Sequence, residues 1–210
     1  DVSEHVMKTL GLRKTSHFGT LDPKVTGVLP IALNRACKLT GFFLGEDKEY
    51  VGIMRLHKPL PEEELKKTLR DFTGKIMQKP PVKSRVARIL REREIKSFEI
   101  LEKSEDGQNI LFKTEVQSGT YIRKLIHDIG EKIGIGAHML ELRRIRAGIF
   151  REDDEKYPGI NLYELEKAAK DEKLLRKIII PGEIISKLFP VIQIKEESAE
   201  RILRGQPVYE

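Results

Sequence analysis

The recurrence of apolar side chains three and four residues apart predicts helices in several parts of the chain. Capping residues set their bounds: Asn34 is a suitable cap, Pro61 precedes three glutamates, and Asn161 with Glu164 forms a capping-box pattern. Glycine follows several of these segments, as is common at helix ends. The helices expected on these grounds cover residues 2–10, 34–43, 61–73, 118–133, 161–169 and 196–204.

Alternation of apolar and polar side chains predicts strands in the middle of the chain. The pattern covers residues 48–56, 97–103, 109–117 and 138–147, and the continuous apolar run at 28–33 predicts a buried strand. The sequence SEDGQN joins the second and third of these segments and is typical of a hairpin turn. Strands mixed with helices and joined by hairpins favour an α+β fold, in which helices flank a mixed, mainly antiparallel central sheet.

The composition is typical of a globular intracellular protein. Hydrophobic residues make up 39% and charged residues 34% of the 210 positions, enough to bury a sizeable core. The chain has no run of 18 apolar residues and no signal-peptide pattern, so we expect no membrane-spanning segment. Its one cysteine, Cys37, excludes an internal disulfide and a cysteine-built zinc site, and favours a reducing compartment.

The net charge of +6 is concentrated in one segment. Residues 75–96 contain eight Lys and Arg against two Glu, so the rest of the chain is neutral. Within this segment, residues 79–88 read KPPVKSRVAR, which predicts a basic loop because prolines interrupt regular structure. A concentrated basic segment is typical of a surface that binds a polyanion such as nucleic acid.

The segment HFGTLDPKVTGVL, residues 17–29, is the strongest candidate for chemistry. It holds one carboxylate, Asp22, among the glycines, threonines and proline that form turns and loops. A carboxylate on a loop of defined shape is more typical of a catalytic or binding residue than of one that stabilises the fold. The histidines lack metal-binding spacing, and the sequence contains no phosphate-loop, dinucleotide-binding or G-x-S-x-G pattern. We therefore expect a site that uses side chains alone.

Three further residues could share a site with Asp22. Arg123 could form a bidentate salt bridge that orients a buried Asp22 and keeps it charged. Tyr50, flanked by charge in a strand, offers a ring for base stacking and a phenol for proton transfer. Tyr121 lies two residues before Arg123 at a helix start. This grouping predicts that Asp22 and Arg123, about a hundred residues apart in sequence, lie within salt-bridge distance in the fold.

Four segments resemble, in order, the motifs of the TruB-type pseudouridine synthases: GTLDPKVTG, KEYVG, SGTYIRKLIHDIG and GAHMLELRR. The resemblance covers essentially residues 1–190 and is closest to the dyskerin-like catalytic subunit of box H/ACA ribonucleoproteins, in its archaeal forms. It implies the pseudouridine synthase fold with a protruding basic thumb loop. The implied activity is RNA-guided isomerisation of uridine to pseudouridine in ribosomal RNA, with transfer RNA as a second possible substrate. The isomerisation involves no redox change or hydrolysis, so no cofactor is expected.

The resemblance implies a role for each candidate residue. Asp22 resembles the catalytic aspartate, which attacks the uridine at ribose C1′ or at base C6, and Arg123 resembles the arginine that pairs with it. Tyr50 resembles the tyrosine that stacks on the uracil and assists proton removal from C5. The remaining candidates resemble substrate-binding positions: His17 beside the flipped nucleotide, Tyr121 and Leu142 in the pocket wall, and Lys79, Lys83, Arg85 and Arg88 in the thumb loop that clamps RNA.

The resemblance also implies partners and a division into domains. The partners are guide RNA, substrate RNA, small zinc-binding and β-barrel companion proteins, and a kink-turn-binding protein. Residues 1–190 correspond to the catalytic domain without the family's N-terminal strand and K-P-x-G-x-T-S segment, and residues 191–210 to the first strand and helix of a PUA domain. The expected location is cytoplasmic in an archaeon and nucleolar in a eukaryote.

Two other functions are compatible with the sequence. A stand-alone tRNA pseudouridine synthase would modify transfer RNA without a guide. A non-catalytic RNA-binding scaffold would need the basic loop alone. The joint presence of Asp22, Tyr50 and Arg123 argues against the scaffold, which has no use for that set.

Overall fold

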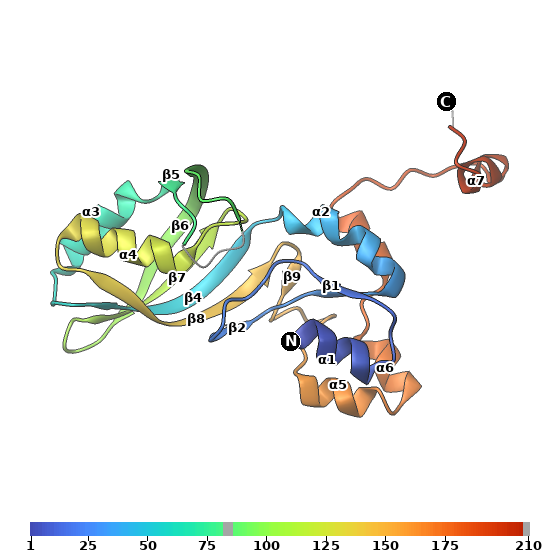
Figure 1. The fold of residues 1–210 in the computed structure, drawn as a ribbon, viewed down its shortest axis with the longest axis horizontal. Helices are drawn as coiled ribbons and strands as arrows, with labels where there is room; N and C mark the ends of the chain where they lie inside the picture. The colour runs from blue at the N-terminus through green and yellow to red at the C-terminus, as the bar shows by residue number, and fades with distance from the viewer. Residues whose placement is uncertain (82–85, 208–210) are drawn as a thin grey trace. The chain divides into compact units, whose positions relative to one another are not determined.

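The computed structural model describes residues 1–81 and 86–207 of the chain. Figure 1 shows how the helices and strands in these residues are arranged. The strands are β1 (Thr15–His17), β2 (Val25–Gly27), β3 (Ile31–Leu33), β4 (Lys48–Leu56), β5 (Gly74–Gln78), β6 (Arg91–Lys103), β7 (Asn109–Val116), β8 (Ala137–Ala147) and β9 (Phe150–Arg151). The α-helices are α1 (Val2–Thr9), α2 (Thr40–Leu44), α3 (Glu62–Asp71), α4 (Ile122–Ile133), α5 (Leu162–Ala168), α6 (Glu172–Ile178) and α7 (Glu196–Leu203), and the 3-10 helices are η1 (Asn34–Leu39) and η2 (Gly182–Lys187).

Within the described residues, seven strands form one mixed sheet in the order β2-β8-β4-β7-β6-β5, with β9 paired to β8 (Figure 1). β2 and β8 run parallel, and the other neighbours run antiparallel. β1 and β3 form a separate antiparallel pair. The arrangement confirms the predicted α+β fold with a mixed, mainly antiparallel central sheet.

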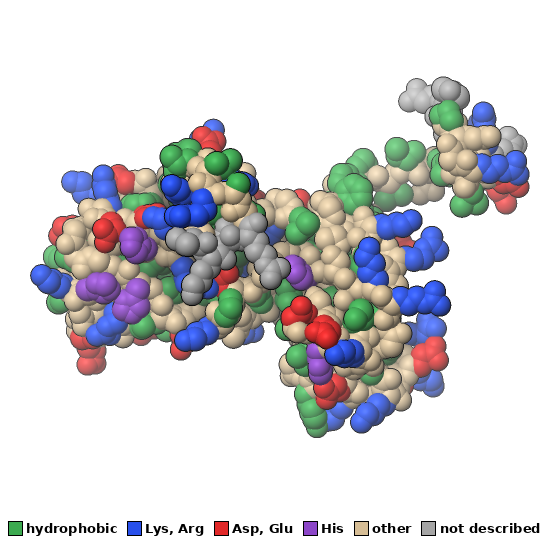
Figure 2. Space-filling model, in the orientation of Figure 1, with side chains coloured by type: hydrophobic (Ala, Val, Ile, Leu, Met, Phe, Trp, Pro, Cys, Tyr) green, Lys and Arg blue, Asp and Glu red, His purple; other side chains and the backbone are tan. Residues whose placement is uncertain are grey.

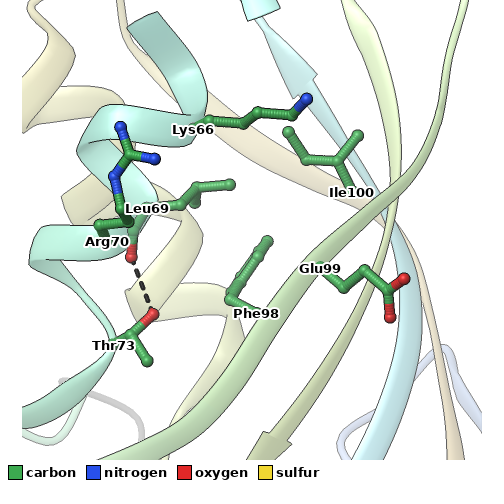
Figure 3. Close-up of a pocket in the computed structure, with 7 residues that line it drawn as sticks. All are labelled: Lys66, Leu69, Arg70, Thr73, Phe98, Glu99 and Ile100. Atoms are coloured by element: carbon green, nitrogen blue, oxygen red, sulfur yellow. Dashed lines mark hydrogen bonds between the residues drawn. The ribbon is translucent and has the colours of Figure 1, made fainter. Parts of the chain in front are cut away.

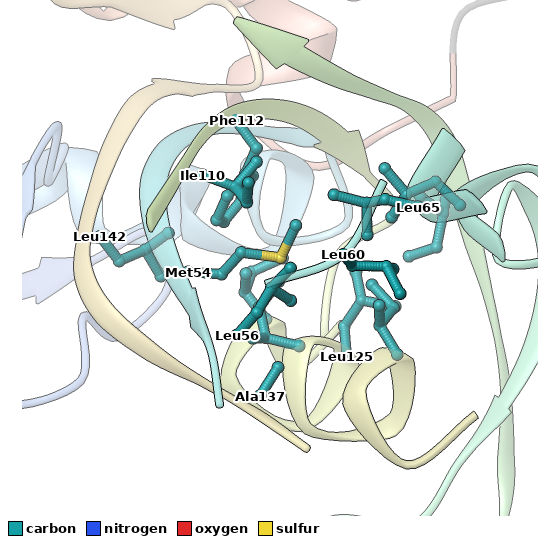
Figure 4. Close-up of a cluster of buried hydrophobic side chains, with 14 of the residues drawn as sticks. Met54, Leu56, Leu60, Leu65, Ile110, Phe112, Leu125, Ala137 and Leu142 are labelled. Carbon is teal, nitrogen blue, oxygen red and sulfur yellow. The ribbon is translucent and has the colours of Figure 1, made fainter. Parts of the chain in front are cut away.

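Helices α3 and α4 cover one face of this sheet and enclose the main hydrophobic core (Figures 1 and 4). Leu65 of α3, Leu125 and Ile129 of α4, Met54 of β4 and Phe112 of β7 are all completely buried. Each such side chain contributes roughly 1.5–3 kcal/mol when it is removed from water. Since β4 and β8 continue from this core to the candidate site residues, the core provides a rigid base for them.

Two local features of the N-terminal region differ from the sequence predictions. The apolar run at 28–33 is not one strand, because β2 ends before it and Pro30, which has no N–H to donate, precedes β3. Asn34 does not cap a helix: its side chain accepts a hydrogen bond from the Arg13 N–H, and its φ of 49° is left-handed. The segment it begins is a 3-10 helix that leads into α2.

Two predicted elements further along the chain also need correction. The helix expected from residue 118 begins at Ile122, because Gly119 adopts a φ of 81° and Thr120 N donates to Gln117 O in a turn. Among the described residues of the C-terminal segment, 191–195 form no strand, since a lone extended segment has no partner for its backbone groups. The capping box of Asn161 and Glu164 at the start of α5 is present as predicted.

The chain divides into two compact units, Asp1–Ile179 and Ile180–Glu210. The first contains both sheets and every candidate site residue. In the parts of the chain that the structure describes, none of the helices is long and apolar enough to cross a bilayer.

Candidate active site

The ion pair predicted between Asp22 and Arg123 is present. Arg123 Nη2, in the first turn of α4, donates to Asp22 Oδ2 at 2.6 Å. Two expectations about the pair are wrong: the contact is single rather than bidentate, and both side chains are 54% exposed. An exposed pair contributes at most about 1 kcal/mol to stability, so its main effect is to orient the carboxylate.

The backbone around Asp22 forms a tight turn. Val25 N donates to Asp22 O at 3.0 Å, which closes a four-residue turn with Pro23 in its second position. Lys24, in the third position, has a φ of 72°. Proline followed by a positive φ is typical of a type II turn, in which glycine is usual at the third position. A lysine there stores some backbone strain, a feature that clusters at functional sites.

Arg144 of β8 holds the ends of this loop together. It is the largest fully buried side chain in the described residues, with 1% exposed. Its Nε donates to Val28 O at 2.8 Å, Nη2 to Gly19 O at 3.0 Å and Nη1 to Thr20 O at 3.4 Å. These carbonyl groups lie on both sides of Asp22 along the chain. One buried guanidinium therefore joins the start and the end of the loop.

Gly27 is required for the loop to reach Arg144. A Cβ atom at this position would lie 2.1 Å from the Arg144 carbonyl oxygen, and the φ of +99° is one that L side chains rarely adopt. The close approach lets Val28 N donate to Arg144 O at 2.7 Å. Glycine is the residue that permits such a backbone contact.

Tyr50 lies opposite Arg144 in the sheet register between β4 and β8. Burial raises the pKa of the Tyr50 phenol above its usual value. The nearby Asp22 carboxylate adds to this, and the Arg144 guanidinium opposes it. The phenol is therefore neutral at pH 7, and Tyr50 lies close enough to Asp22 for the two groups to interact electrostatically.

Lys48 is a second buried cation close to the loop. Its Nζ donates to Leu44 O at 2.9 Å, to Ser118 Oγ at 3.1 Å and to Glu46 O. Burial, and then the charge of Arg144, lower the pKa of Lys48 to about 8. Because Ser118 belongs to the segment that leads into α4, Lys48 connects β4 with the element that carries Arg123.

Tyr121 and Leu142 are the two residues predicted to form the pocket wall. Tyr121 precedes α4, and its backbone N–H and carbonyl both bond to the amide group of Gln78, which is itself buried. Leu142 faces the core, pairs in register with Gly52 and Val25, and is 9% exposed. The sequence interpretation did not include Gln78, although its amide group binds the backbone of the residue that precedes α4.

His17 lies on β1, at the entry to the loop. Its ring Nδ1 is buried without a hydrogen-bond partner in the described structure. The next residue, Phe18, stacks on Phe43 with ring centroids 4.9 Å apart and also packs against Phe150. This aromatic cluster anchors the start of the loop, and His17 stays a predicted substrate contact.

The basic segment of residues 79–88 follows β5, a strand that the sequence pattern does not predict. Lys79 and Arg88 are exposed there, and Arg88 Nε donates to Pro80 O at 3.3 Å. Lys83 and Arg85 lie outside the described residues. Elsewhere on the face shown in Figure 2, Lys and Arg side chains are interspersed with Asp and Glu, which accords with a neutral remainder of the chain.

A pocket of about 300 Å³ lies between α3 and β6, away from these residues (Figure 3). Leu69, Phe98 and Ile100 supply its apolar surface, with Lys66 and Arg70 on the helix side. Its lining includes no residue of the Asp22 loop or of α4, so it is not part of the candidate site. Among the described residues, no group of three or more His, Cys, Asp or Glu side chains is placed to hold a metal ion.

Arg144 and Lys48 were missed as site residues from the sequence. A signal for Arg144 exists: it lies two residues after Leu142, and alternate residues of a strand face the same side. Lys48 gives no such signal, because a lysine at the start of a strand is ordinarily exposed.

Comparison with known proteins identifies the family of the chain. The chain matches the N-terminal domain of TruB family pseudouridylate synthases over residues 7–122, and the C-terminal domain of tRNA pseudouridylate synthase B over residues 123–186. The chain belongs to the TruB family. The first match contains Asp22 and Tyr50, and the second begins at Arg123.

Similar proteins in the TruB family come from archaea. The chain is 45% identical to a probable tRNA pseudouridine synthase B of Methanocaldococcus jannaschii, over all of this chain and 62% of the relative. A solved complex of Cbf5 with Nop10 and Gar1 matches 97% of this chain with a TM-score of 0.88 and 41% identity. An H/ACA ribonucleoprotein bound to substrate RNA with 2′-deoxyuridine matches 99%, with a TM-score of 0.86 and 38% identity. The chain spans 62% of the length of each.

Proposed function

We propose that this chain is the catalytic part of a protein that isomerises uridine to pseudouridine in RNA, directed by a guide RNA. One observation carries the proposal: a half-exposed Asp22 carboxylate on a braced loop, oriented by Arg123 and close to the partly buried Tyr50. Family membership supports the same chemistry. We assign residues 1–190 to the catalytic domain and residues 191–210 to the first elements of a PUA domain.

The reaction breaks the N1–C1′ bond and forms a C5–C1′ bond, while the C5 proton leaves and N1 gains one. Asp22 supplies the nucleophile, at C1′ or at C6, and a covalent step of this kind divides one high barrier into two lower ones. A neutral phenol is a poor base, so we assign Tyr50 to stacking on the uracil and to relaying the C5 proton. Reaching Asp22 requires flipping the uridine out of its helix, at a cost of roughly a few kcal/mol.

The proposed partners follow from the charge distribution and from the solved relatives. Lys79, Lys83, Arg85 and Arg88 would contact the phosphates of the substrate RNA. Cbf5 is solved with Nop10 and Gar1, and an H/ACA particle is solved with substrate RNA. We propose companion proteins of the zinc-binding and β-barrel types, a kink-turn-binding protein, and a guide RNA for the protein that contains this chain.

A stand-alone tRNA pseudouridine synthase is the second candidate. The names of the curated archaeal relatives favour it, since the relative in Methanocaldococcus jannaschii is called a probable tRNA pseudouridine synthase B. The two candidates share Asp22 and its chemistry and differ in how the target uridine is selected.

The test uses the full-length protein, assembled with guide RNA and companion proteins, on a ribosomal RNA fragment complementary to the guide. Pseudouridine is mapped at single-nucleotide resolution. We expect site-specific product that disappears when the guide is omitted or its pairing sequence is scrambled. Efficient product in unmodified transfer RNA by the protein alone favours the second candidate. Absence of product under both conditions, with RNA still bound, would support a scaffold and reject the proposal.

A further inference from the structure

Arg144 is a buried cation that has no carboxylate neighbour within salt-bridge distance among the described residues. Burying a charge costs several kcal/mol unless hydrogen bonds and opposite charges compensate for it. Here the compensation comes from the carbonyl groups of Gly19, Thr20 and Val28, and the Tyr50 phenol also interacts with the guanidinium. An apolar side chain would fill the same space at lower cost, so a role in packing alone does not explain an arginine at this position.

The geometry of the guanidinium explains the choice of residue. Its N–H donors are fixed in one plane, so the acceptors bound to Nε, Nη1 and Nη2 are held at fixed positions relative to one another. Gly19 and Thr20 precede Asp22 by three and two residues, and Val28 follows it by six. Arg144 thus fixes both ends of the short segment that carries the carboxylate. A lysine, with one nitrogen on a flexible stem, cannot hold three such acceptors in one plane.

We propose that Arg144 is a positioning residue of the isomerisation, which sets the place of the Asp22 carboxylate by holding the carbonyl groups on both sides of it. The inference rests on the proposed function and adds to it a residue that does not touch the substrate. A displacement of about 1 Å in a reacting group can cost about 100-fold in rate. Loss of Arg144 should therefore reduce the chemical step and leave RNA binding nearly unchanged.

Arg146 provides a matched control on the same strand. It is also largely buried, and it pairs with Glu49 at 3.3 Å and with Glu115 at 2.8 Å, away from the Asp22 loop. Replacing Arg146 disturbs a buried ion pair in β8 without removing a hydrogen bond to the loop. The comparison of Arg144→Lys with Arg146→Lys separates positioning of the loop from general stability of the strand.

The experiment compares full-length Arg144→Lys, Arg144→Met and Arg146→Lys with the unmodified protein, at a temperature where each is folded by circular dichroism. Three quantities are measured: the single-turnover rate of pseudouridine formation, the Kd for substrate RNA, and hydrogen exchange at the amides of Val25 and Val28. Val25 N donates to Asp22 O within the loop, and Val28 N donates to Arg144 O of β8, so their exchange reports the order of the loop and its contact with β8 without reference to activity.

We expect both Arg144 variants to show a rate about 100-fold lower in single turnover, to keep RNA Kd within about threefold, and to exchange the two amides faster. Arg146→Lys should leave the rate and the exchange of these amides unchanged. A rate within about threefold of the unmodified protein in Arg144→Lys would overturn the inference, as would unchanged amide exchange. If the unmodified protein forms no pseudouridine, the proposed function fails, and the amide exchange still decides whether Arg144 orders the loop.

Discussion

Asp22 and Glu49 are both carboxylates held by arginine, but their surroundings differ in exposure and in the number of cations. The Glu49 side chain is 10% exposed and lies within 4 Å of three cations: Lys113 at 2.7 Å, Arg146 at 3.3 Å and Arg151 at 3.4 Å. Asp22 is more than half exposed. In the described part of the chain its carboxylate contacts one cation, through one oxygen.

Under the proposed function, the same kind of ion pair serves two purposes in one fold. Glu49 is surrounded by donors, so a substrate cannot reach it, and its removal would take one carboxylate from Lys113, Arg146 and Arg151. Arg146 and Arg151 would keep a second carboxylate each. Asp22 keeps an accessible oxygen because Arg123 contacts only one of its two oxygens and leaves the side chain 54% exposed. The loop in turn depends on Arg144, whose three hydrogen bonds go to backbone carbonyl groups.

The largest expected effect on stability concerns Glu49. Glu49→Gln should destabilise the protein by about 1–3 kcal/mol, because it removes the charge of a buried carboxylate, while Arg146 keeps Glu115 and Arg151 keeps Asp153 as partners. Urea unfolding measures this change. The matched control is Glu152→Gln, which breaks the more exposed pair with Arg143 and should cost less than about 1 kcal/mol. Equal costs for the two variants would remove the distinction between buried and exposed pairs.

The same variant has a pH dependence. Burial by itself would raise the pKa of Glu49, but Lys113 and Arg146 outweigh it and the pKa is lowered. A lowered pKa in the folded state gives stability that is present above the unfolded pKa, near 4.5, and is lost as pH falls through the folded value. The stability difference between the unmodified protein and Glu49→Gln should therefore shrink below pH 4.5.

Arg123→Met tests the exposed ion pair between Asp22 and Arg123. We expect a decrease of about 100-fold in single-turnover rate, because the carboxylate is no longer oriented. The stability change should stay below about 1 kcal/mol, since the pair is exposed. The measurement pairs single-turnover kinetics with urea unfolding. A large loss of stability with the rate intact would place Arg123 in the same structural role as the Glu49 cluster.

Lys48 tests how burial of a cation affects folding stability. Burial and the charges of Arg144 and Arg146 lower its pKa to about 8, against the opposing effect of Glu46 and Asp47. Between pH 8 and 10 the unfolded state binds more protons, so folding stability rises with pH. Relative to Lys48→Met, the unmodified protein should gain about 2 kcal/mol over this range in urea unfolding. A flat difference would show that Lys48 is solvated.

The smallest effect concerns the basic loop. Replacing Lys79 and Arg88 by Ala should reduce the slope of log Kd for RNA against log salt by up to about one unit for each phosphate that the loop no longer neutralises. Replacing Lys66 and Arg70 of α3 removes the same charge elsewhere and should leave the slope unchanged. Equal slopes for both double variants would place the RNA on a different surface.

The main elements of the fold could be predicted because their patterns are local. β4 and β8 alternate side chains over nine and eleven residues, and the capping box at Asn161 is a local signal. β1, β5 and α6 were missed because segments of three to seven residues carry little periodicity. The segment at 191–195 has the composition of a strand, but strand formation depends on a partner.

The candidate site was predictable where a motif identifies a residue by type. Asp22 and Arg123 were paired correctly, but their exposure was not foreseen, because accessibility depends on the packing of distant segments. The buried state of Arg144 depends on a loop more than a hundred residues earlier in the chain, whose carbonyl groups no side-chain pattern reveals. Reactive side chains are therefore easier to predict from a sequence than the side chains that hold the backbone in place.

The proposed function requires that Asp22, and not the better paired Glu49, reacts with uridine. Single-turnover pseudouridine formation by full-length Asp22→Asn is measured beside Glu49→Gln, at a temperature where both are folded. We predict no detectable product from Asp22→Asn with RNA Kd within about threefold of the unmodified protein, and near-normal product from Glu49→Gln. Product formation by Asp22→Asn, or its loss in folded Glu49→Gln, would contradict the claim.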